Sequence, residues 1–329
     1  MYTDILYRVS QKLIHRNEHI SYNDAIEICN LGLEEIIDLV ILSSEVTSAN
    51  HEKGVYLCSI MSVRTGACPE DCSFCAQSIF NRPLYPYEPF REPGEILQSA
   101  IRAEKEGASE FCIVSSGRGP GKRTMEKVME TIGLLRRYTG LSVGCSLGIL
   151  SEEQAYMLAS AGVRRYNHNL ETSKSFFPKV CSTHEYDARV NTAMLVKKHG
   201  IELCCGGIFG IGESWQDRIE LAFSLRELDP EVVPINFLNP REGSLLQNKQ
   251  LLEPVEAIKI ISIFRLVMPG TILLCGGGRE TVLQDFQSFM ITAGINSLIT
   301  GDYLTTSGDP EEKDIEMINK MGLRVLRYN

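Results

Sequence analysis

Short runs of β-branched and apolar residues alternate along most of this chain with longer segments of helical periodicity. The apolar runs predict eight strands, at residues 55–63, 111–116, 142–148, 164–170, 201–210, 232–238, 271–277 and 297–303. The segments between them predict seven helices, at residues 95–106, 124–138, 152–161, 186–198, 215–227, 254–267 and 282–293. This alternation predicts a parallel sheet, because successive parallel strands need a crossover connection that is usually a helix.

Eight strand–helix units favour a closed (β/α)8 barrel of the TIM type, an α/β fold in which chemistry takes place at the carboxyl ends of the strands. An open doubly wound sheet is the alternative, but no Gly-x-Gly-x-x-Gly sequence opens the first unit. Residues 1–50 predict two or three helices ahead of the barrel. We therefore divide the 329 residues into an N-terminal helical segment (1–50), a barrel domain (51–315) and a C-terminal segment (316–329).

The charge balance and the apolar runs exclude several classes of partner. Lys and Arg number 33 against 42 Asp and Glu, a formal net charge of −9, so we expect no nucleic-acid partner. The best apolar run, Ile36 to Leu42, is short and contains Asp38, so we expect no membrane span. The N-terminus carries scattered charges and no apolar segment, which predicts no secretory signal and a cytoplasmic location. In that reducing compartment the 11 cysteines are not expected to form disulfides.

Three cysteines follow the first predicted strand in the sequence Cys68-Pro-Glu-Asp-Cys72-Ser-Phe-Cys75. Three thiolates on one short loop can hold a metal ion or an iron–sulfur cluster. A structural zinc site normally has four protein ligands, commonly from two Cys-x-x-Cys pairs. The loop therefore favours an iron–sulfur cluster with one open coordination position, with zinc as the alternative.

Three further cysteines, Cys112, Cys145 and Cys204, fall within different predicted strands. Two interpretations stay open for them. A buried free cysteine is commonly a small core residue, but three on different strands of one barrel could converge on a second metal centre. Cys205 is adjacent to Cys204, so only one of the two faces the barrel interior unless a bulge re-aims both. Cys275 lies near a run of three glycines, which leaves its direction open.

Polar residues near the ends of the predicted strands are candidates for ligand binding. Asn167, Asn169 and Glu171 share a strand face, and Asn236 adds another amide that could bind a urea or amide group. The alternative is that these side chains only tie down loops. The glycine-rich segment 206–213 permits close approach by a flat ligand or forms an ordinary turn. No Gly-x-Ser-x-Gly, His-Glu-x-x-His or P-loop sequence supports a hydrolase or a kinase.

Together these segments resemble the biotin synthase family of the radical S-adenosylmethionine (SAM) superfamily. They occur in the family order and cover most of the chain from about residue 55 to 315. The segments that carry the resemblance are TGACPEDCSFCAQS (65–78), YNHNLETS (166–173), CCGGIFGIGE (204–213), PINFL (234–238), GGRE (277–280) and GDYLTTSG (301–308).

The resemblance implies a (β/α)8 barrel that holds two clusters. The first is a [4Fe-4S] cluster on Cys68, Cys72 and Cys75, whose open iron binds SAM. The second is expected deep in the barrel and is [2Fe-2S] in the best-known members; its implied ligands are Cys112, Cys145, Cys204 and Arg279. The extra cysteines Cys205 and Cys275 are candidate additional ligands, and a four-iron cluster with an additional sulfide would also fit a thiol-rich pocket.

The resemblance further implies SAM as cofactor and dethiobiotin as substrate. In the implied reaction a 5′-deoxyadenosyl radical abstracts hydrogen from dethiobiotin, and sulfur from the second cluster closes the ring of biotin. A flavodoxin or ferredoxin would supply electrons, and a homodimer is expected. The residues implied to contact SAM are Phe74, Asn169, Glu171, Arg189, Ile208 and Glu213, and those implied to contact dethiobiotin are Asn167 and Asn236.

The sequence leaves two rival functions. One is another radical SAM enzyme of similar architecture, such as the maturase or methylornithine-synthesis relatives. Those are not expected to keep Cys112, Cys145, Cys204 and Arg279 together. The other is a non-catalytic iron–sulfur protein, which would have stable clusters and would not bind SAM.

Overall fold

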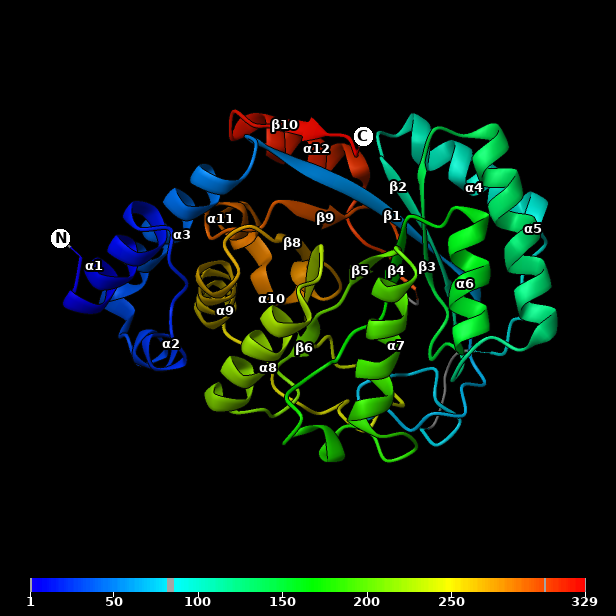
Figure 1. The fold of residues 1–329 in the computed structure, drawn as a ribbon, viewed down its shortest axis with the longest axis horizontal. Helices are drawn as coiled ribbons and strands as arrows, with labels where there is room; N and C mark the ends of the chain where they lie inside the picture. The colour runs from blue at the N-terminus through cyan, green and yellow to red at the C-terminus, as the bar shows by residue number, and fades with distance from the viewer. Residues whose placement is uncertain (1, 82–85, 305, 329) are drawn as a thin grey trace.

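The computed structural model describes residues 2–81, 86–304 and 306–328, so position 305 of the segment 301–308 lies outside it. All pairings between named strands are parallel, and the strand order β1-β2-β3-β4-β5-β7-β8-β9 closes on itself because β9 pairs with β1 (Figure 1). The predicted (β/α)8 barrel is thereby confirmed. The strands are β1 (Gly54–Arg64), β2 (Glu110–Ser115), β3 (Ser142–Ser146), β4 (Arg165–Asn167), β5 (Glu202–Cys204), β6 (Gly207–Phe209), β7 (Val232–Phe237), β8 (Ile272–Cys275), β9 (Ser297–Ile299) and β10 (Arg324–Leu326).

Helices follow most barrel strands and cover the outside of the barrel (Figure 1). Local sequence signals explain several of their ends. Ser151 forms a capping box with Gln154 at the start of α6, and Gly162 ends that helix in the left-handed region at φ 83°. The helices of the barrel are α4 (Pro93–Lys105), α5 (Lys122–Tyr138), α6 (Glu152–Ala161), α7 (Tyr186–Lys198), α8 (Trp215–Leu228), α9 (Pro254–Val267), α10 (Arg279–Leu283), α11 (Gln287–Thr292) and α12 (Glu311–Lys320). Short 3-10 turns occur at Phe177–Lys179 and Gln284–Phe286.

Two predicted elements are interrupted in the structure, and one strand was not predicted. The helix predicted at 282–293 is two helices, α10 and α11, because Gln284 adopts a left-handed conformation at φ 49° and interrupts them. The strand predicted at 201–210 is interrupted between β5 and β6, but its register against β7 is the same on both sides. No bulge therefore re-aims the adjacent cysteines. Strand β10, which pairs with the start of β1, was not predicted.

The N-terminal helices pack against the barrel beside α9, at the left of Figure 1. They are α1 (Asp4–Ser10), α2 (Tyr22–Cys29) and α3 (Ile36–Asn50), with a π-helical turn at Gln11–His15 and a 3-10 turn at Leu33–Glu35. The buried Lys259 of α9 donates to the Cys29 and Leu31 carbonyls at 2.7 Å each. The division at residues 50 and 315 stays a prediction, and α12 runs across the second boundary.

The strands present two different faces, because side chains alternate along each of them. Outward residues such as Leu57, Phe111 and Val233 join the large core beneath the helices. A separate, smaller cluster fills the barrel interior and consists of Cys58, Cys112, Cys204, Val232, Leu274 and Ile299. This interior cluster forms the floor beneath the carboxyl ends of the strands.

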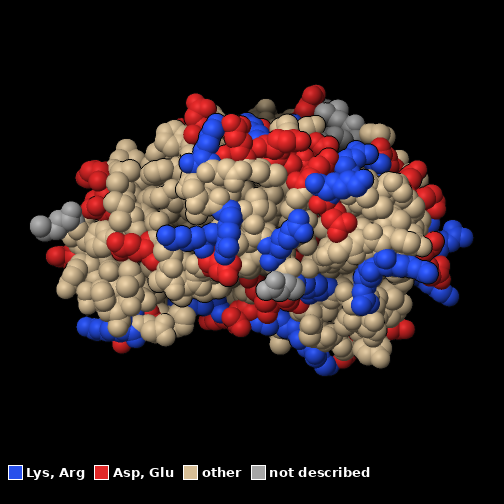
Figure 2. All heavy atoms as spheres, turned by 90° about the horizontal axis from the view of Figure 1, so that it is seen from above, with Lys and Arg blue, Asp and Glu red and all other residues tan. Residues whose placement is uncertain are grey.

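No helix in the described part of the chain is long and apolar enough to cross a bilayer. On the face drawn in Figure 2, Lys and Arg side chains lie among Asp and Glu side chains.

Candidate functional site

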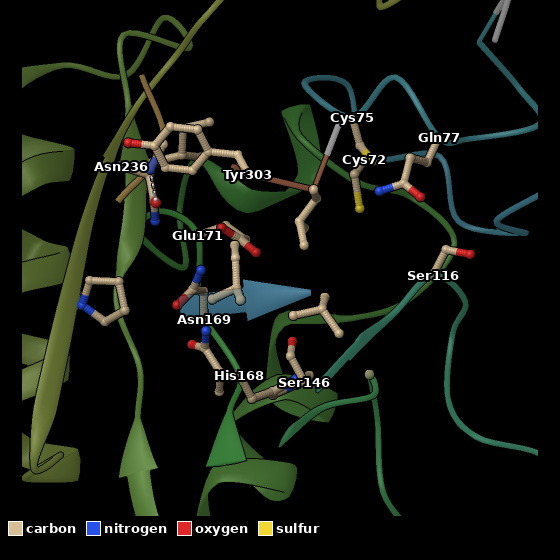
Figure 3. A pocket seen from close by; sticks show the side chains of 18 of the residues that line it. Cys72, Cys75, Gln77, Ser116, Ser146, His168, Asn169, Glu171, Asn236 and Tyr303 are labelled. Atoms are coloured by element: carbon tan, nitrogen blue, oxygen red, sulfur yellow. Dashed lines mark hydrogen bonds between the residues drawn. The ribbon is translucent and has the colours of Figure 1, made fainter. Parts of the chain in front are cut away.

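A cavity of about 440 Å³ opens at the carboxyl ends of the strands and continues into the barrel interior. Its walls come from the loop after β1, the ends of β4 to β7 and the segment after β9. Figure 3 shows Cys72 and Cys75 of the loop, Asn169 and Glu171 after β4, and Tyr303 around one space. Cys72 and Cys75 therefore face the groups that follow the strands, at the end where barrel enzymes carry their chemistry.

The loop after β1, residues 66–78, is the cluster loop. Its cysteines Cys68, Cys72 and Cys75 are free thiols that all line the cavity. The backbone is held by its own hydrogen bonds: the Cys68 amide donates to the Gln77 carbonyl at 3.0 Å and the Cys75 amide to the Cys72 carbonyl at 3.0 Å. Asn81 Nδ2 donates to the Cys75 carbonyl at 2.6 Å. Three thiols on a loop with satisfied backbone groups fit a three-cysteine iron–sulfur cluster.

A second segment, residues 180–184, clamps the cluster loop. The Ser182 and Thr183 amides donate to the Asp71 carboxylate at 2.8 and 3.2 Å, and the Ser73 amide donates to the Val180 carbonyl at 2.9 Å. Cys181 and His184 of this segment lie with Glu70 of the loop, their ligand atoms within 4.8 Å of one another. Sequence reasoning gave these three residues no role, since about 110 positions separate the two segments and no local spacing joins them.

The residues expected to contact SAM line the same cavity, with one exception. Arg189 Nη1 donates to the Asn169 carbonyl at 2.7 Å and lies 3.5 Å from Glu171 Oε1. Burial raises the pKa of Glu171, and the Arg189 cation acts in the opposite direction. Phe74 and Ile208 contribute apolar surface to the same cavity.

The exception is Glu213, which does not line this cavity in the part of the chain that the structure describes. Its carboxylate accepts from the amides of Gly210 and Ile211 at 3.0 and 2.9 Å and from Arg218 Nε at 2.8 Å. Glu213 thus holds the glycine-rich turn after β6 in shape. Its carboxylate lies outside the cavity that the other expected SAM contacts line.

The two candidate substrate-binding amides differ in whether their polar atoms are already hydrogen-bonded within the protein. Asn236 Nδ2 donates to the Gly207 carbonyl at 3.1 Å and its Oδ1 accepts from the Gly277 amide at 3.0 Å, so this amide joins strand ends. Asn167 Oδ1 is buried and has no hydrogen-bond partner among the described residues. His168 Nε2 is in the same state, and burial lowers the pKa of this imidazole well below its usual range. Asn167 and neutral His168 are therefore the polar groups most in need of a ligand partner.

The interior thiols on the cavity wall are Cys58, Cys112 and Cys204, which form the interior triad. The family resemblance implies an inward position for Cys112 and Cys204, and both line the cavity. Cys58 was given no partner from sequence, although it has the same strand parity as Ile60, which also faces the interior. Its position among the other two thiols follows only from the register of β1 against β2.

The other expected ligands of the second cluster lie elsewhere. Cys145 packs in the outer core, because Gly144 rather than Cys145 pairs with Cys112 and faces the interior. Cys205 and Cys275 also belong to the outer core. Arg279 is fully buried, but no part of it lines the cavity among the described residues. The set of Cys112, Cys145, Cys204 and Arg279 is therefore not brought together.

The Arg279 guanidinium is already hydrogen-bonded to three side chains. Its guanidinium donates to Tyr303 Oη at 3.1 Å, Gln287 Oε1 at 2.5 Å and Asp314 Oδ2 at 2.7 Å. Because Arg279 begins helix α10 rather than ending strand β8, its side chain follows the helix toward α12. These contacts give it a structural role.

A buried ion-pair network closes the barrel interior at the amino ends of the strands, where Glu110, Arg165 and Glu202 begin β2, β4 and β5. Arg165 contacts Glu110 and also lies 2.6 Å from Glu202 Oε2, and its guanidinium carbon stands 4.5 Å from the centre of the Tyr328 ring. Burial raises the pKa of all three interior-triad thiols, and the Arg165 cation acts in the opposite direction on each of them. The cation therefore favours the thiolate forms that bind metal.

Comparison with known proteins identifies the family of this chain. The radical SAM superfamily model matches residues 62–225, and the model for the biotin and thiamin synthesis associated domain matches residues 234–324. A biotin synthase from Pelotomaculum thermopropionicum is 42% identical over 315 residues, covering 96% of this chain and 98% of that protein. One from Rhodococcus jostii is 41% identical over 329 residues, covering 99% of this chain and 97% of that protein.

Solved structures share the architecture at much lower identity. A methylornithine synthase matches with a TM-score of 0.84 at 18% identity, covering 98% of each chain. The FeFe-hydrogenase maturase from Carboxydothermus hydrogenoformans matches with a TM-score of 0.82 at 16% identity, covering 97% of this chain and 78% of that one. At such identities these likenesses support the fold alone.

Proposed function

The chain belongs to the biotin synthase family of radical SAM enzymes, and from this premise we propose that it converts dethiobiotin to biotin by inserting one sulfur atom. The observation that carries the proposal is the single cavity that joins the cluster loop, the Asn169–Glu171–Arg189 wall and the interior thiols. A sulfur-inserting radical enzyme needs its radical source, its substrate and its sulfur source within contact of one another.

The residues of the cluster loop fit the first cofactor. Cys68, Cys72 and Cys75 would hold the [4Fe-4S] cluster, since all three thiols line the cavity. When bound, this cluster and SAM supply a 5′-deoxyadenosyl radical, and a second cluster supplies the sulfur. Arg189 offers a cation for the SAM carboxylate, and Glu171 offers an acceptor for hydroxyl groups of the nucleoside.

The polar groups left without partners fit the substrate. Asn167 Oδ1 could accept a hydrogen bond from a ureido N–H of dethiobiotin, and His168 Nε2 is a second unused polar atom beside it. Asn236 would act by fixing the strand ends around the ring, because both ends of its amide are already bonded. Closed barrel walls exclude water from the radical, and rigid strands position the target C–H bonds better than loops do.

The second cluster stands as a family expectation, with Cys112 and Cys204 positioned to contribute to it. Its type is either [2Fe-2S] or a four-iron cluster with an additional sulfide, and iron counting separates the two. The implied set with Cys145 and Arg279 does not fit the structure, because these two side chains point away from the cavity. The sulfur-donating step therefore cannot be assigned to that set of four ligands.

The proposal includes three features of the surroundings. An electron donor such as flavodoxin or ferredoxin would reduce the first cluster, a homodimer is the expected assembly, and the location is cytoplasmic. The last agrees with 11 cysteines that are all free thiols, since a reducing compartment keeps them so.

The test is a product analysis. Anaerobically reconstituted protein is incubated with SAM, a reductant and dethiobiotin, and biotin and 5′-deoxyadenosine are quantified by mass spectrometry. Biotin with about two deoxyadenosines per molecule is expected, because two C–H bonds must be cleaved to close the ring. Deoxyadenosine without biotin would retain the radical SAM assignment and refute the substrate. Neither product, from protein with intact clusters, would favour a non-catalytic iron–sulfur protein.

A further inference from the structure

We propose that Cys58, Cys112 and Cys204 are the thiolate ligands of the second iron–sulfur cluster, in place of a set that includes Cys145 and Arg279. This inference rests on the proposed function, which requires a second cluster as sulfur source. It concerns the ligands alone and can fail while the proposed function holds.

Strand register brings Cys58 and Cys112 together. Strands β1 and β2 are parallel neighbours in which Cys58 pairs with Glu110 and Ile60 pairs with Cys112. The two cysteines are thus one pleat apart on the same inward face of adjacent strands. Cys204 approaches from β5, where it pairs with Asn167, and all three thiols belong to one buried interior cluster. Each of the three also lines the cavity that the cluster loop covers.

The neighbouring strand β3 offers room instead of a thiol. Its inward position opposite Cys112 is Gly144, and a Cβ built there would stand 3.4 Å from Cys112 Sγ. A glycine at this point leaves the space in front of the Cys112 thiol unfilled, as a bound cluster requires. Cys145, one residue on, is fully buried on the opposite face among outer-core residues.

Arg279 is an unsuitable ligand because its partners would be lost. Asp314 is buried at 1% exposure and lies 2.7 Å from Arg279 Nη2. Turning the guanidinium into the cavity would leave this carboxylate buried without its cation, a strongly unfavourable state. The interior has its own cation in Arg165, which lines the cavity and has one buried nitrogen, Nε, without a partner among the described residues. The guanidinium is already paired with Glu110 and Glu202, and its Nε–H is the donor that stays available beside the three thiols.

Three thiolates leave the cluster with one coordination position that no described side chain is placed to fill. Glu110 is the nearest carboxylate, 3.5 Å from Cys58 Sγ, and it is held by Arg165. An iron without a protein ligand at this position could bind an additional sulfide, which is the atom that the proposed function transfers to the substrate.

The experiment isolates the second site by removing the first. In the full chain, C68A/C72A/C75A eliminates the cluster loop thiols, and the variant is reconstituted anaerobically with iron and sulfide. Iron, acid-labile sulfide and Mössbauer spectra are then compared after adding C58A, C58S or, as the matched control, C145A. The inference expects bound iron to fall to background with either Cys58 substitution and to remain unchanged with C145A. Circular dichroism checks that each variant is folded, and C58S retains the side-chain size if C58A does not fold.

The outcomes separate the ligand set from the function. Iron that survives C58A and C58S but is lost with C145A overturns the inference. The inference also fails if the C68A/C72A/C75A variant binds no iron before any further substitution. A second readout is pulsed EPR of the reduced cluster in protein labelled with 15N-arginine. No directly bonded nitrogen is expected, and a strong 15N coupling would restore Arg279 as a ligand. The unsubstituted protein is assayed for biotin in parallel. If it makes no biotin while C58A still causes loss of iron, the ligand set stands and the proposed function is refuted.

Discussion

Two groups of three cysteines border one cavity, and they come together in different ways. Cys68, Cys72 and Cys75 lie within eight consecutive residues, on a hydrogen-bonded loop that borders the cavity. The interior triad comes from β1, β2 and β5, and only barrel closure brings it together. A local cluster of ligands is thus encoded by spacing, whereas a non-local one is encoded by register.

The difference between the two groups predicts a separation of activities, and the cluster loop should show the greatest loss. Cys72→Ala should lower 5′-deoxyadenosine formation by at least about 100-fold, since even the supporting partners of metal ligands are worth 10–100-fold. The measurement is deoxyadenosine released per chain with SAM and a reductant. Cys29→Ala, in the buried face of α2, is the control and should leave the rate unchanged. Equal losses in both variants would mean that global folding, and not cluster binding, was disturbed.

Substitution in the interior triad should separate the two products. Cys58→Ala should abolish biotin while SAM cleavage stays within about twofold, because substitutions at separate sites act independently. Biotin and deoxyadenosine are measured in the same reaction. Cys145→Ala, an equally buried cysteine on the outward face, should retain both products. If Cys58→Ala still makes biotin, the two cysteine groups do not have separate roles.

The buried cation beneath the interior triad should affect stability, whereas the exposed ion pairs near the cluster loop should not. Arg165→Met leaves Glu110 buried without its partner and should lower the free energy of unfolding by about 3–5 kcal/mol. Urea denaturation followed by circular dichroism measures this change. Arg91→Ala breaks an exposed pair with Glu88 and should cost no more than about 1 kcal/mol. Recovery of stability in Glu110→Gln/Arg165→Met would confirm the cause, and a loss no larger than that of Arg91→Ala would contradict it.

One source of acid sensitivity lies outside both cysteine groups. Burial, with the nearby Arg265 cation, lowers the pKa of His51 to about 4. An unfolded histidine titrates near 6.5, so between about pH 6.5 and 4 the unfolded chain binds the additional proton. Stability should therefore fall as the pH is lowered through this window. His51→Gln should flatten the dependence of the urea midpoint on pH, and the exposed His15→Gln should not.

Much of the fold was predictable from the sequence because its signals are local. Helices α6, α7 and α9 were predicted to the residue, since apolar periodicity and end signals such as the Ser151 cap lie within each segment. The left-handed break at Gln284 and the pairing of β10 with β1 were missed. Neither has a strong local signal, because Gln is an ordinary helix residue and β10 acquires its role only from its partner strand.

The order of the βα units, the three-cysteine loop and the motifs that identify the family all follow from the sequence without a structure. Which thiols share the interior depends instead on the tertiary structure. Alternation along β3 turns Cys145 outward and leaves Gly144 inside, the start of α10 directs Arg279 to Asp314, and the register of β1 turns Cys58 inward. The physical reason is that one residue of strand register exchanges the two faces of a barrel, and register is fixed by pairing with distant strands rather than by neighbours in the chain.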